Sequence, residues 1–147
     1  MKRIRRIVYA TDFSSASRRA FSTAIGLAKS ANARLTLIHV MATPIPMVPE
    51  LYFDAGLFER VEQQTREWST RRLKKLADNA TKQGARVTSQ LREGDAAQQI
   101  VRAAKSARAD LVVMGTHGRA AIPRFFLGSG ADRVVRTASC PVMTVRG

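Results

Sequence analysis

The 147-residue chain has little of what covalent or metal cross-links need, with one cysteine and two histidines. A single cysteine, Cys140, excludes a disulfide framework and any zinc site built from several thiolates. The two histidines lie far apart in sequence and have no carboxylate at ligand spacing, so a metal site made of protein side chains alone is not expected. We therefore predict a fold held by its apolar core in a reducing compartment.

Long apolar runs are also missing. No segment has the roughly 18 consecutive apolar residues of a membrane-spanning helix. The apolar stretch before Asp12 is shorter than the about 7–15 residues of a secretory signal. We expect a cytoplasmic chain without membrane insertion. With 147 residues and a hydrophobic fraction of 45%, the chain has the material for one domain spanning 1–147.

Acidic residues are scarce, since 11 Asp and Glu stand against 25 Lys and Arg and leave a net charge of +14. Such a balance favours polyanionic partners. The only dense basic groups along the sequence are 2–6 and 71–75, so nucleic-acid binding is expected to be at most weak and non-specific. One candidate function remains open on this basis. It is a nucleotide-free interaction protein whose basic surface docks acidic partners or nucleic acid.

Apolar runs alternate with helical periodicity along the chain. Strands are expected over 4–10, 34–40, 85–91, 111–114 and 141–145, with helices between them starting near 15, 57, 95 and 131. This order predicts an α/β fold, a five-stranded parallel sheet with helices on both faces, because each parallel crossover needs a helix. Val61 and Trp68 are expected on the apolar side of the second helix, and Val134 and Val135 to face inward from the last.

Ligands of open parallel sheets bind beyond the carboxyl ends of the strands. The chain has no P-loop and no glycine-rich dinucleotide fingerprint. Its glycines gather instead after the fourth strand, in the pattern G-x2-G-x9-G-S formed by Gly115, Gly118 and Gly128-Ser129. Glycines let backbone N–H groups approach a ligand, and the N-terminus of the last helix favours a phosphate. A tight strand exit followed by an ordinary helix cap would explain the same residues.

Within this frame the chain resembles the universal stress protein family along its full length. The resemblance rests on the segments 7–14, 94–100, 109–118, 128–129 and 139–142. It implies a Rossmann-like fold with strand order 3-2-1-4-5, homodimers, and ATP binding by members that carry the complete glycine motif, as this chain does. The function it implies is a nucleotide-binding module of the stress response or of signalling.

Carried over by position, the resemblance also implies a binding site. Asp12 would face the ribose, and the backbone at Val40 would meet adenine. The residues assigned to ribose, phosphates or their surroundings are Met114, Gly115, His117, Gly118, Gly128, Ser129, Gly130 and Ala131. The ligand would be ATP, with ADP and AMP as alternatives, and any Mg²⁺ would arrive with the phosphates.

Several roles stay open at this level. Asp12 could instead cap the first helix, and His117 could be a solvated loop residue. Arg119 and Arg124 lie between the motif glycines and point either to phosphates or to solvent. No catalytic triad can be assembled, so the protein is expected to bind rather than catalyse, with slow ATP hydrolysis as the furthest activity.

The final strand predicts how two copies would meet. In the order 3-2-1-4-5 it lies at an edge, where unpaired backbone groups invite another strand. We expect a homodimer through Val142–Val145, with Pro141 at the start of the strand because proline cannot donate to a ladder.

Overall fold

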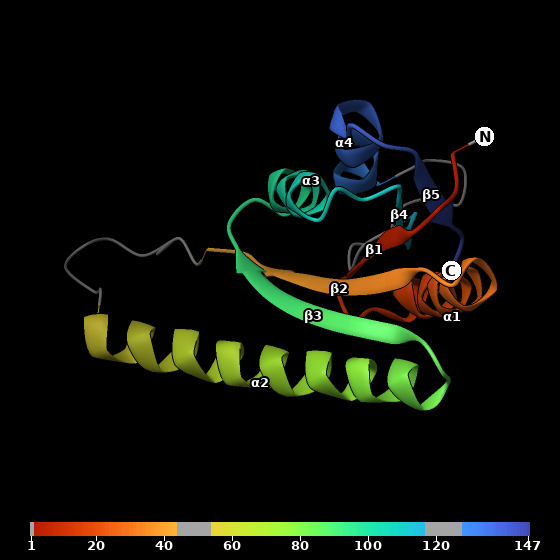
Figure 1. The fold of residues 1–147 in the computed structure, drawn as a ribbon. Helices are drawn as coiled ribbons and strands as arrows, with labels where there is room; N and C mark the ends of the chain where they lie inside the picture. Colours follow the sequence, from red (N-terminus) through yellow and green to blue (C-terminus); the bar gives the residue numbers. More distant parts are fainter. Residues whose placement is uncertain (1, 44–53, 117–127) are drawn as a thin grey trace.

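The computed structural model describes residues 2–43, 54–116 and 128–147 (Figure 1). Strands and helices alternate in the expected order, and their ends differ from the predicted ones by a residue or two. The elements are β1 (Arg6–Thr11), α1 (Ser15–Ala31), β2 (Arg34–Met41), α2 (Ala55–Lys82), β3 (Arg86–Glu93), α3 (Ala96–Ser106), β4 (Leu111–Gly115), α4 (Ser129–Thr137) and β5 (Val142–Val145).

The five strands form one parallel sheet in the order β3-β2-β1-β4-β5, which confirms the predicted fold class. β1 and β4 lie in the middle and are buried on both faces, as their continuous apolar runs indicate. The two ends of the order, β3 and β5, are the edges of the sheet. Among the described helices, none is long and apolar enough to cross a bilayer.

Helices cover the sheet on both sides, with α1 and α2 on one face and α3 and α4 on the other (Figure 1). On the first face, Tyr9 and Leu37 pack against Phe21 of α1 and Leu73 of α2. On the second face, the small residues of α3 let that helix lie close to the sheet. Alternate residues of each strand thus supply two separate cores.

Helix ends follow local chemistry that the sequence makes visible. Ser14 caps α1 by accepting from the N–H of Ser17, and Asp95 caps α3 by accepting from the N–H of Gln98. Gly84 follows α2 with a φ of +90°, a conformation that residues with a Cβ rarely adopt. These three residues fix where the chain turns from helix or strand into the next element.

The apolar side of α2 differs from the prediction. Leu73 is 4% exposed, whereas Trp68 is 37% and Val61 50% exposed. At 1.5 Å per residue a helix of this length spans about 42 Å, while an eight-residue strand spans about 26 Å. The N-terminal part of α2 therefore projects past the end of β3 (Figure 1), and Val61 has no sheet to pack on.

The prediction for α4 was half right. Val134 is fully buried against the sheet, but Val135 is 45% exposed. Consecutive residues of a helix lie about 100° apart, so a short helix that rests on a sheet by one face cannot bury both.

Candidate functional site

The place with the best claim to a ligand is where β1 and β4 end, at their carboxyl-terminal ends. These two strands are paired, with Ala10 opposite Met114. From there the chain continues from β1 into α1 on one face of the sheet, and after β4 the next described helix, α4, lies on the other face. Such a switch point is where open α/β sheets bind ligands. The predicted residues Asp12, Met114 and Gly115 all lie at this place.

The start of α4 is held at this switch point by a backbone hydrogen bond. The N–H of Gly128 donates to the carbonyl of Thr116, directly after β4, over 2.7 Å. Gly128 is the N-cap residue, and α4 has no side-chain cap. Its first N–H groups, those of Ser129, Gly130 and Ala131, are therefore the donors that an anion at this position would meet.

Two neighbouring residues keep that helix end accessible and fixed. A Cβ placed on Gly130 would meet no atom of the described residues within 4 Å, so none of these residues fills the space beside it. Ala131, by contrast, is 5% exposed and packs into the core between α4 and the sheet. Among the described residues, Gly130 thus leaves room beside the start of α4.

Asp12 follows β1 and forms the turn into α1. Its Oδ1 accepts from the N–H of Ser14 over 2.9 Å, and Ser14, not Asp12, caps the helix. The neighbouring Thr11 hydroxyl accepts from the N–H of Phe13 over 3.0 Å. Both side chains thus hold the backbone of this turn in one conformation.

A stacked aromatic cluster that sequence reasoning missed lies beside Asp12. Phe13 adopts a φ of +63°, unusual for a residue with a bulky side chain. Its ring lies 4.2 Å from that of His39 and makes an edge contact with Trp68 at 5.5 Å, both measured between centroids. The Arg72 guanidinium lies 5.2 Å from the Phe13 ring centre. The apolar periodicity of α2 predicts that Trp68 makes a packing contact, but it does not predict that Phe13 is the partner.

Hydrogen bonds hold the His39 ring of this cluster, and the side chain of Tyr9 on β1, to backbone carbonyls. His39 Nδ1 lies 2.8 Å from the carbonyl oxygen of Thr11 and fixes the imidazole against β1. The Tyr9 hydroxyl donates to the carbonyl of Ser17 over 2.8 Å. Burial raises the pKa of Tyr9 above its ordinary value, so it stays a neutral donor at physiological pH.

Val40 lies on the other side of β1, near the end of β2. The ladder between β1 and β2 ends at the pair Thr11 and His39, while Val40 is still paired with Arg92 of β3. Val40 therefore lies one residue beyond the last pair of the ladder between β1 and β2, next to the turn that contains Asp12.

Four residues named from the sequence, His117, Gly118, Arg119 and Arg124, lie outside the described residues. The structure thus brings together Asp12, Gly115 and the start of α4, and places Val40 one strand away. Within the described ranges, no group of three or more His, Cys, Asp or Glu side chains is arranged to hold a metal ion.

Known structures share this architecture. UspA, a universal stress protein of Lactobacillus plantarum, matches with a TM-score of 0.86 at 23% identity, over 99% of this chain and 100% of that one. A universal stress protein solved in complex with cAMP matches with a TM-score of 0.72 at 23% identity, over 99% and 98%. One from Archaeoglobus fulgidus in complex with dAMP matches with a TM-score of 0.65 at 20% identity, over 99% and 100%.

Sequence relatives give the family. The chain is 35% identical over 143 residues to a universal stress protein of Methanocaldococcus jannaschii, covering 97% of this chain and 82% of the relative. The model of the universal stress protein family matches residues 3–146. The chain belongs to the universal stress protein family.

Proposed function

We propose that this chain binds ATP at the carboxyl ends of β1 and β4 and acts as a nucleotide-dependent module of the stress response. The observation that carries the proposal is the hydrogen bond from Gly128 to the Thr116 carbonyl. It presents the uncapped N-terminus of α4 at the switch point of the sheet, where phosphates are favoured. Two family members of the same fold were solved with the nucleotides cAMP and dAMP.

The residues present suit such a ligand. The N–H groups of Ser129, Gly130 and Ala131 would hold phosphates, and no described residue fills the space beside Gly130. Asp12 would accept from a ribose hydroxyl, and the backbone near Val40 would meet the base. A bound nucleotide would supply its own Mg²⁺ with its phosphates. ADP and AMP could occupy the same groups with fewer phosphate contacts.

One residue ties the proposed site to the edge of the sheet. The carbonyl of Thr116 accepts from Gly128 at the site, while its N–H donates to the carbonyl of Val145 on β5 over 3.1 Å. A ligand that shifts the start of α4 therefore acts on a residue bonded directly to the edge strand. This supports a signalling role in which nucleotide occupancy biases the surface that β5 presents.

We further propose that β5 pairs with its copy in a homodimer. β5 is an edge strand, and Met143 on it is 38% exposed. The carbonyls of Pro141 and Val145 bond β4, and in a parallel ladder the same alternate residues, including Met143, use their N–H groups toward that neighbour. Val142 and Thr144 therefore present their backbone groups outward, and pairing would use these two residues.

The dimer is tested by removing one outward donor. Thr144→Pro should shift the protein toward monomer in sedimentation at protein concentrations on the order of tens of micromolar. Thr144→Ala, which keeps the N–H group, should sediment as wild type. Met143→Pro is a poorer test, because it removes a donor that serves β4. A wild-type monomer at these concentrations would reject the homodimer.

Nucleotide binding is tested by occupying the phosphate path. Gly128→Val and Gly118→Val should abolish ATP binding in calorimetry, while the fold, followed by circular dichroism, stays intact. Gly26→Val is the matched control, since Gly26 is exposed on α1 and a Cβ there meets no described atom within 4 Å. Affinity unchanged in both site variants would refute the proposal. Nucleotide released from denatured purified protein would identify the natural ligand.

The proposed setting is the cytoplasm. Cys140 is a free, half-buried thiol, and burial raises its pKa, which keeps it protonated and slow to oxidise. A chain with one such cysteine is typical of a reducing compartment.

A further inference from the structure

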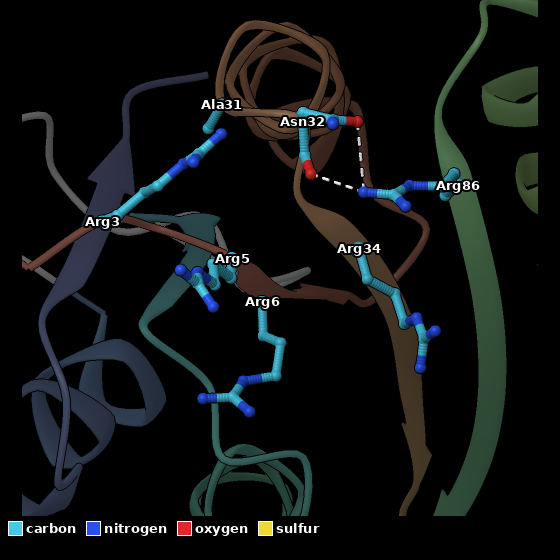
Figure 2. Close-up of a pocket in the computed structure, with 7 residues that line it drawn as sticks. All are labelled: Arg3, Arg5, Arg6, Ala31, Asn32, Arg34 and Arg86. Atoms are coloured by element: carbon cyan, nitrogen blue, oxygen red, sulfur yellow. Dashed lines mark hydrogen bonds between the residues drawn. The ribbon is translucent and has the colours of Figure 1, made fainter.

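A second site lies at the amino-terminal ends of the strands, opposite the end of the sheet at which Asp12 and Gly115 lie. Five arginines line a pocket of about 340 Å³ there, together with Ala31 and Asn32 at the end of α1 (Figure 2). The arginines are Arg3, Arg5, Arg6, Arg34 and Arg86. Figure 2 shows them coming from the N-terminal segment and from the first residues of β1, β2 and β3.

The strand register creates this cluster. Arg6 begins β1 opposite Arg34, which begins β2, and Arg34 is opposite Arg86, which begins β3. Neighbouring strands lie about 4.8 Å apart, and like charges directly opposite each other destabilise a sheet. Three arginines in one row therefore place a local electrostatic cost on the folded chain, which an anion bound among them would relieve.

Among the described residues, few acidic groups neutralise this charge. Asp110 is the acidic partner at these strand ends, and it pairs with Lys2 at 3.3 Å and with Arg6 at 3.7 Å. Arg86 donates to the carbonyl and to the side-chain oxygen of Asn32, which are neutral groups. Arg6 Nε is inaccessible to water and has no hydrogen-bond partner among the described residues.

Three of the arginines are free to act on a ligand. Arg3, Arg5 and Arg34 are exposed, and within the described ranges none of these side chains makes a hydrogen bond or an ion pair. A guanidinium cannot lose its charge near neutral pH and presents donors in a fork that matches two oxygens of one phosphate. These side chains thus keep their full donor capacity for a ligand.

The lining decides the class of ligand. An apolar molecule would leave the guanidinium groups without partners, and a single carboxylate would neutralise only one of them. Linked phosphates concentrate several negative charges and many acceptor oxygens in a small volume, and arginine binds them bidentately. We propose that this pocket is a binding site for an oligophosphate, meaning two or more linked phosphate groups. The shared chemistry admits a free inorganic chain or the phosphate tail of a nucleotide.

This site is separate from the one between β1 and β4. All strands of a parallel sheet run in the same direction, so their first residues lie together on one side and their last residues on the opposite side. The six residues of β1 span about 20 Å. The proposal therefore stands whether or not a nucleotide binds near Gly128.

Calorimetric titration of the full chain with inorganic tripolyphosphate tests it. Wild type should bind one molecule per chain at the pocket. R5Q/R34Q should weaken that binding about tenfold or more, since each substitution removes charge-assisted hydrogen bonds. The matched control is R60Q/R71Q, which removes the same charge from exposed arginines of α2 and should change affinity by less than about threefold.

Further titrations distinguish the arginine pocket from the site near Gly128, and a nucleotide from a free phosphate chain. Gly128→Val should still bind tripolyphosphate with the same dependence on Arg5 and Arg34. In that background, ATP bound with the same dependence would assign a nucleotide tail, and ATP not bound would assign a free chain. Either result supports the oligophosphate site.

Three results would overturn the proposal. The first is no binding of tripolyphosphate by wild type. The second is an equal loss in R5Q/R34Q and R60Q/R71Q, which would show a general charge effect. The third is binding of single-stranded RNA that depends on Arg5 and Arg34 while tripolyphosphate does not bind, which would make the pocket part of a nucleic-acid surface.

Discussion

Replacing Asp110 by alanine should destabilise the protein more than any exposed acidic residue does. Asp110 lies just before β4, and its side chain is only 4% exposed. Its Oδ2 accepts from the backbone N–H groups of Arg5 and Arg6, each over 3.0 Å. The carboxylate thus fastens the entry of β1 to the entry of β4, more than 100 positions away in sequence.

The magnitude follows from those two bonds. A hydrogen bond to a charged group contributes about 1.5–3 kcal/mol, but water replaces part of it where the donor is exposed, as at Arg5. The ion pair with Lys2 adds little, because Lys2 is 83% exposed. Asp110→Ala should therefore lower the free energy of unfolding by about 2–4 kcal/mol, measured by urea denaturation at one protein concentration.

The matched control is Asp78→Ala on α2. Asp78 pairs with Lys74 at 3.0 Å, but its side chain is 58% exposed. Such a pair is worth less than about 1 kcal/mol. If Asp110→Ala costs no more than Asp78→Ala, the two backbone hydrogen bonds do not hold β1 as described.

The same carboxylate gives a pH dependence of known sign. The N–H of Arg5 is the main cause that lowers the pKa of Asp110 below its ordinary 3.8; burial opposes this, and Lys2 and Arg6 reinforce it. Since the pKa is lower in the folded state, the contribution is full well above pH 3.8 and is lost as the pH falls below that value. The difference in the free energy of unfolding between wild type and Asp110→Asn should therefore become smaller as the pH falls below 3.8. A difference that stays constant down to about pH 3 would contradict the linkage.

Three further predictions concern the walls of the candidate site and α2. Ser14→Ala should lower the free energy of unfolding by about 1 kcal/mol, because it removes the cap of α1, and urea denaturation checks this. Phe13→Ala should cost about 0.5–1.5 kcal/mol in lost ring contacts and change the emission of Trp68, the single tryptophan. Leu73→Ala should cost about 2–5 kcal/mol, whereas Val61→Ala should stay within about 0.5 kcal/mol, because only the first lies over the sheet. Equal costs for the last pair would contradict the overhang of α2.

Much of the fold follows from local sequence signals. The strands are short and apolar, and the residues that cap or end helices, such as Ser14, Asp95 and Gly84, act within a few positions of themselves. These features need no knowledge of the rest of the chain. The parallel order then follows from the alternation of strand and helix.

Contacts between distant elements could not be predicted in this way. Helical periodicity identifies the apolar side of α2 but not where the sheet beneath it ends, so Val61 was placed wrongly. The stack of Phe13, His39 and Trp68 joins three elements, and no spacing in the sequence relates them. Periodicity is a property of one element, and a site is a property of several.

The arginine pocket shows why charge is hard to interpret along a sequence. The dense basic group 2–6 was visible, but Arg34 and Arg86 stand alone in their own segments, and clustering therefore looked weak. In a parallel sheet the first residues of all strands lie on the same side, so residues separated in sequence by a whole strand and helix become neighbours. The register sets Arg6, Arg34 and Arg86 in one row. Part of the net charge of +14 is thus concentrated by topology, and that concentration, rather than the net charge, is what a multiply charged ligand would recognise.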